Sequence, residues 1–69
     1  MTNDKVQVYS TTQLIDAEML KNYLEVKGIS VFILNKMDSS YHFGDIELLV
    51  SPDEVLKAKK LIEDFSRNE

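Results

Sequence analysis

Residues 17–34 carry the hydrophobic pattern around which the chain is organised: AEMLKNYLEVKGISVFIL. Apolar residues first recur at helical spacing, and the members of this core stripe are Leu14, Ala17, Leu20 and Leu24. The pattern predicts a helix over about residues 12–27. Gly28 is expected at the C′ position, because glycine accepts a left-handed conformation without a Cβ clash. The apolar run at residues 29–34 then predicts a strand.

Two other segments alternate between apolar and polar residues and predict further strands, at residues 5–9 and 45–50. Successive side chains of a strand point to opposite faces of the sheet. In each strand, therefore, alternate side chains pack against the helices, and the others lie on the uncovered face. The residues expected to meet the helices are Val6, Val8, Val31, Ile33, Ile46, Leu48 and Val50. The apolar residues expected on the uncovered face are Tyr9, Phe32, Leu34 and Leu49.

Both helices have candidate start signals. Ser10 and Gln13 have the spacing of a capping box, and Ser51 and Glu54 have the same spacing around Pro52. Proline is favoured at the first helical position, since its missing N–H has no partner there in any case. The second helix is expected to run to about residue 65, with the core stripe Val55, Ala58, Leu61, Ile62 and Phe65.

The predicted element order is β-α-β-β-α in one domain of residues 1–69, with loose ends at residues 1–4 and 66–69. A right-handed crossover makes the first and second strands parallel. A hairpin over residues 35–44 makes the third strand antiparallel to the second. The split β-α-β solution places the third strand in the centre, giving sheet order 1-3-2 with both helices on one face. We therefore predict an α+β, ferredoxin-like fold with a three-stranded antiparallel sheet.

The chain resembles the small bacterial domains called putative prokaryotic signal-transducing proteins, over about residues 6–65. The matching features are Val8-Tyr9, Ala17-Glu18 with Leu20 and Leu24, Gly28-Ile29, the segment 44–48, Val50-Ser51-Pro52 and Ala58. The resemblance implies a topology like that of the PII signalling proteins and a regulatory role that is not enzymatic. It implies no particular ligand.

Candidate interaction surfaces lie on the sheet and on the first helix. Tyr9, Phe32, Leu34 and Leu49 form one predicted patch on the uncovered face, and a contiguous apolar patch often marks an interface. The alternative is that the segment after residue 65, or the long connection, covers the patch. The first helix also has a second apolar stripe, whose members are Ile15, Met19 and Val26. The first and second strands also have bare edges, since the predicted sheet has only three strands. These features predict a homo-oligomer, a dimer or higher, formed through the open sheet face or through a strand edge.

The connection at residues 35–44 is a candidate recognition loop that a partner orders. Its recognition residues are Met37, Tyr41, His42 and Phe43. Asp38, Ser39 and His42 have the residue types of a hydrolytic triad, but a loop does not hold a triad at hydrogen-bonding distances. His42 has no second histidine or cysteine with which to complete a metal site. We expect no catalytic centre, metal or cofactor here. Tyr41 corresponds only in position to the modifiable tyrosine of PII proteins.

Composition excludes several classes of function. The chain of 69 residues has a net charge of −4 and no cysteine. Acidic chains repel phosphate backbones, so we predict no nucleic-acid partner. No apolar run reaches the ~20 residues of a membrane span, and residues 1–4 lack the pattern of a signal peptide. A cytoplasmic location is expected.

The sequence therefore predicts a small regulatory or signal-transducing module that acts through protein–protein contact. The alternative is a small-molecule sensor whose ligand binds at a subunit seam, where Gln7, Glu47 and the loop residues are the candidate polar contacts. Partner, ligand and pathway are not specified by the residues.

Overall fold

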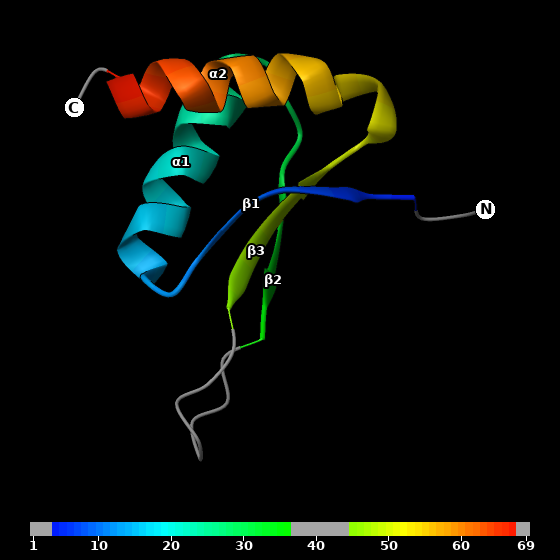
Figure 1. Cartoon of the computed structure of the whole chain (residues 1–69). Helices are drawn as coiled ribbons and strands as arrows, with labels where there is room; N and C mark the ends of the chain where they lie inside the picture. Colours follow the sequence, from blue (N-terminus) through cyan, green and yellow to red (C-terminus); the bar gives the residue numbers. More distant parts are fainter. Residues whose placement is uncertain (1–3, 37–44, 68–69) are drawn as a thin grey trace.

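A computed structural model describes residues 4–36 and 45–67 and has the predicted order of elements (Figure 1). The elements are β1 (Val6–Thr11), α1 (Leu14–Val26), β2 (Phe32–Asn35), β3 (Ile46–Val50), the 3₁₀ turn η1 (Pro52–Glu54) and α2 (Val55–Arg67). The predictions for Met37, Tyr41, His42 and Phe43 concern residues outside the described ranges.

The described strands form one sheet with the order β1-β3-β2, as predicted. β3 is antiparallel to both of its neighbours. Its central position is visible in Figure 1, where α1 and α2 pack together beside the sheet. The fold is therefore the α+β, ferredoxin-like arrangement with a three-stranded sheet.

A β-bulge in β1 changes which residues face the helices. Gln7 lies opposite Leu49, whereas Tyr9 lies opposite Leu48, so Val8 is the extra residue between them. Residues directly opposite each other share a face of the sheet, and Leu48 is fully buried against the helices. The prediction that Tyr9 lies on the uncovered face was therefore wrong. The bulge inserts one residue and shifts the alternation by one position.

The core lies between the helices and one face of the sheet. Its buried residues are Ala17, Leu20, Leu24, Ile29, Val31, Ile46, Leu48, Val50 and Ala58. Val8, Tyr9, Ile33, Tyr23, Val55, Leu61, Ile62 and Phe65 are partly buried around them. Two predicted core residues are more exposed than expected. Leu14 is 49% exposed, because it is the first residue of α1, and Val6 is exposed at the start of β1.

Gly28 ends the first helix as predicted, with φ at +94°. Its N–H donates to the carbonyl of Glu25, and the N–H of Ile29 donates to the carbonyl of Leu24. These bonds satisfy carbonyls at the end of the helix and turn the chain toward the sheet. Ile29 is consequently buried three residues before β2 begins.

The predicted side-chain caps are not formed. Gln13 is the N-cap of α1 without a side-chain cap bond, and its own N–H donates to Thr11 Oγ1 over 3.1 Å. At the second helix, the N–H of Glu54 donates to the backbone carbonyl of Ser51 over 2.9 Å. This bond closes η1, so the predicted capping box is replaced by a 3₁₀ turn. α2 itself reaches Arg67, two residues beyond the predicted end.

Candidate functional site

The uncovered face of the sheet carries three neighbouring apolar side chains, which we call the open-face patch: Phe32, Leu34 and Leu49. Phe32 and Leu34 are 47% and 44% exposed, and Leu49 is half-buried. Leu49 lies opposite Phe32 across β2 and β3. The patch is the predicted one without Tyr9, which the bulge moves to the helix face.

Charged side chains border the open-face patch on two sides. Lys5 places its Nζ 4.5 Å from the centre of the Phe32 ring, a geometry that favours a cation–π contact. Lys36 Nζ lies 3.2 Å from Glu47 Oε2. Lys5, Phe32, Ile33, Leu34 and Leu49 line a broad depression of about 490 Å³. The sequence reasoning missed Lys5, although its place two residues before Gln7 indicates the open face.

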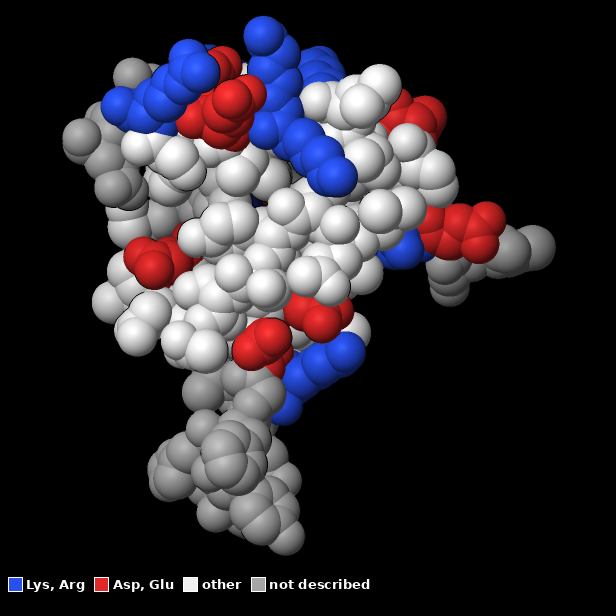
Figure 2. Space-filling model, in the orientation of Figure 1, with Lys and Arg blue, Asp and Glu red and all other residues white. Residues whose placement is uncertain are grey.

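The second apolar stripe on α1 is exposed, as its position in the sequence predicted. Ile15, Met19 and Val26 all have large exposed fractions. Figure 2 shows that charged side chains gather over α2, while much of the surface below them is uncharged. These three residues remain candidates for an interface.

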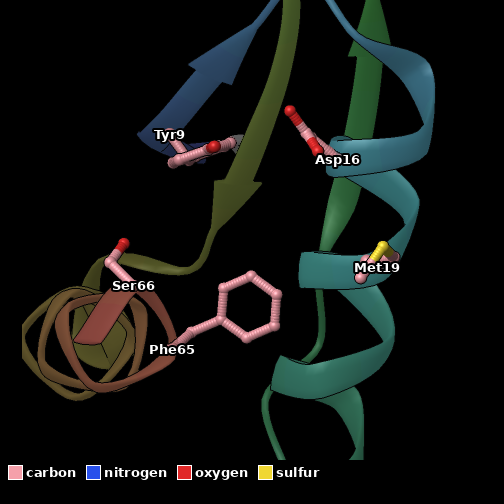
Figure 3. A pocket seen from close by; sticks show the side chains of 5 residues that line it. All are labelled: Tyr9, Asp16, Met19, Phe65 and Ser66. Carbon is pink, nitrogen blue, oxygen red and sulfur yellow. The ribbon is translucent and has the colours of Figure 1, made fainter. Parts of the chain in front are cut away.

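A pocket lies where β1 and α1 meet the last turn of α2, and we call it the α1–α2 pocket (Figure 3). Its volume is about 90 Å³. Its lining residues are Tyr9, Asp16, Met19, Phe65 and Ser66. They come from three elements that are far apart in the sequence. No motif predicts such a site, because the bulge and the helix packing together create it.

The last turns of the helices are joined by aromatic side chains. The rings of Tyr23 and Phe65 lie 5.0 Å apart, tilted by 50°. Lys27 Nζ lies 5.5 Å from the centre of the Tyr23 ring. Tilted aromatic pairs of this kind stabilise their contact by about 0.5–1.5 kcal/mol beyond area burial. This contact holds the Phe65 ring beside the α1–α2 pocket.

Groups of three or more metal-ligating side chains do not occur among the residues that the structure describes. The recognition loop was predicted over residues 35–44; of these, Asn35 is the last residue of β2, and residues 37–44 lie outside this part of the chain. In the described ranges, neither helix has the length and apolarity needed to cross a membrane.

The comparisons with known proteins identify a family and no individual relative. The family model described as "Putative prokaryotic signal transducing protein" matches residues 5–66. The searches of curated proteins and of solved structures returned no match. The matched range includes every described helix and strand except the last residue of α2. The chain belongs to the family of putative prokaryotic signal-transducing proteins.

Proposed function

We propose that this protein is a cytoplasmic, non-enzymatic regulatory module that acts through protein–protein contact, and that it self-associates through the open-face patch. The family description supports a role in signal transduction. The observation that carries the proposal is the contiguous exposure of Phe32 and Leu34 beside Leu49 on the uncovered sheet face.

The layer structure supports a second copy as the occupant of this face. The shortest principal extent of the Cα trace is 15 Å, which corresponds to one helix layer on one sheet layer. A domain of this size buries only about 60% of the surface of its unfolded chain, so association adds burial that the monomer lacks. Two such sheets packed face to face would lie about 10 Å apart and enclose both patches in one core.

The strand edges are weaker candidates for self-association than the face. The bulge at Val8 interrupts the pairing geometry of β1, and bulges protect sheet edges from further pairing. β2 contains only four residues, Phe32–Asn35, and short edge strands are poor templates. The face, in contrast, offers apolar area at about 25 cal/mol per Å² buried.

Sedimentation equilibrium of the full chain at high micromolar concentration tests the proposal. We expect a dimer for the wild type and a monomer for Leu49→Glu and for Phe32→Glu, because each variant places a carboxylate in the buried contact. The control is Leu56→Glu, which makes the same chemical change as Leu49→Glu at an 84% exposed position on α2. Circular dichroism checks that each variant is folded.

A monomeric wild type at these concentrations would contradict the proposal. Equal dissociation by Leu56→Glu and Leu49→Glu would also contradict it, because the effect would then reflect net charge alone. Phe32→Glu keeps the test decisive if the half-buried Leu49 does not tolerate a charge.

The sensor function is the second candidate. The α1–α2 pocket of about 90 Å³ is well below the roughly 300 Å³ at which metabolite pockets begin. The broad depression of about 490 Å³ on the open face is large enough, but it is open to solvent on one monomer. A metabolite would therefore bind there only if a subunit seam closed over it, with Glu47 and Gln7 on the open face as the polar candidates. Such a ligand would raise the dimer fraction in the same sedimentation experiment.

A further inference from the structure

We propose that the α1–α2 pocket binds the positively charged end of an organic cation, an alkylammonium or alkylguanidinium group. Tyr9, Asp16, Met19, Phe65 and Ser66 line this surface pocket from three elements (Figure 3), and Asp16, Met19 and Ser66 are exposed. The inference does not depend on self-association, because the pocket is formed within one chain and on the opposite side of the sheet from the open-face patch.

The charge in the pocket is a single carboxylate. Asp16 lies in the first turn of α1 and takes part in no ion pair with any described residue. Arg67 in the last turn of α2 is the basic residue next to Ser66 in the sequence, but it pairs with another carboxylate: its Nη2 lies 3.5 Å from Glu63 Oε2. The Asp16 carboxylate is therefore available for a cation from outside the chain. The net charge of −4 attracts such a ligand at long range.

Two aromatic rings complete a surface suited to an organic cation. Phe65 extends from α2 toward α1, and Tyr9 approaches from β1 (Figure 3). Organic cations bind the faces of such rings, and guanidinium groups also stack on them. The contact with Tyr23 restrains the Phe65 ring before a ligand arrives. Met19 adds a polarisable sulfur to the wall.

The end of α2 contributes a second negative potential. Ser66 lies in the last turn of α2, which ends at Arg67. The last four carbonyls of a helix lack intrahelical partners and form the negative end of its dipole. A cation in the pocket would lie near these carbonyls and near the Ser66 hydroxyl. The first turn of α1, which contains Asp16, brings the positive end of that helix's dipole to the same pocket, so the Asp16 carboxylate, and not the helix dipoles, favours a cation over an anion.

The size and composition of the pocket restrict the ligand further. Its volume of about 90 Å³ corresponds to roughly three water molecules at about 30 Å³ each. This accommodates the charged end of a side chain or of a small amine, but not a nucleotide. Hard metal ions prefer six or more oxygen ligands, whereas this lining offers one carboxylate and two hydroxyls with two rings and a thioether.

NMR titration of the full-length protein with n-butylguanidinium and n-butylammonium chlorides at constant ionic strength tests this proposal. We expect saturable shifts of the Met19 methyl group and the Phe65 ring signals. The neutral control 1-butanol has the same alkyl chain without the charge. A lysine- or arginine-containing tripeptide forms a second arm: tighter binding of the peptide would indicate a protein side chain as the source of the cation, and tighter binding of the free amine a small molecule.

Asp16→Asn removes the charge at nearly constant shape. Glu18→Gln is the matched control, because it makes the same charge change at an exposed position on the same helix outside the pocket. We expect Asp16→Asn to weaken binding at least about fivefold, and Glu18→Gln to change it less than about twofold. Equal shifts with 1-butanol, equal effects of the two variants, or no saturable shift with any of the cations would overturn the proposal. The amide spectrum of each variant shows whether it is folded.

Discussion

Tyr9 lies opposite Leu48 across β1 and β3, one position away from the partner that strict alternation assigns to it. The shift follows from the bulge between Gln7 and Tyr9, which places Val8 and Tyr9 against the core and leaves Gln7 opposite Leu49. The bulge thereby removes an aromatic ring from the open face and supplies one wall of the α1–α2 pocket.

The bulge predicts unequal effects of two neighbouring substitutions in β1. Tyr9→Ala should lower the free energy of unfolding by about 2 kcal/mol, because it removes packing against the core. Gln7→Ala should change it by less than about 0.5 kcal/mol, since Gln7 is an exposed residue on the other face. Urea denaturation of both variants measures the difference. Equal destabilisation by the two would contradict the assigned register.

Gly28 predicts a backbone effect that is separate from packing. A Cβ added at this position meets no atom within 4 Å, so space does not limit the substitution. The backbone limits the substitution instead, because φ is +94° and residues with a Cβ rarely adopt this conformation. Gly28→Ala should therefore lower the free energy of unfolding by about 1 kcal/mol, and Gly28→Asn by less, because asparagine tolerates positive φ better.

Thermal unfolding of the two Gly28 variants, followed by circular dichroism, orders their stabilities. Ser30→Ala, at an exposed position two residues later, serves as a control for general sensitivity of this turn. An alanine variant as stable as the wild type would show that the turn relaxes to a negative φ without cost.

The acidic balance of the chain predicts the absence of nucleic-acid binding. The chain has twelve acidic and eight basic residues, so its net negative charge repels a phosphate backbone instead of attracting it. Fluorescence anisotropy with a short DNA duplex and with a single-stranded RNA should show no binding at physiological ionic strength. An affinity that falls steeply as salt is added would disprove this prediction.

Much of the fold follows from local sequence. The apolar spacing of Ala17, Leu20 and Leu24 specifies the buried face of α1, and these residues are in fact its buried ones. Gly28 ends that helix for a conformational reason that belongs to glycine alone. Alternation in β3 similarly predicted its buried face. Element order then limits the sheet to few topologies, because crossovers have a fixed hand.

Two local signals predicted details that the structure does not have. Ser51 and Glu54 have capping-box spacing, but a backbone bond closes a 3₁₀ turn at that point. Leu14 fits the helical stripe, yet it is the first residue of α1 and stays largely exposed. Hydrophobic spacing describes a helix face but not where the neighbouring layer ends.

The sequence by itself determined the elements, their order and most of the core, since these depend on periodicity and on a glycine conformation that act within a few residues. The tertiary structure decided the candidate sites. The pairing of β1 with β3 introduced the bulge at Val8, and this single extra residue assigned Tyr9 to the helix face. The packing of α2 on α1 then brought Phe65 and Asp16 to the same pocket. Contacts between segments so far apart in the chain have no local signal, because they depend on how the layers pack against each other.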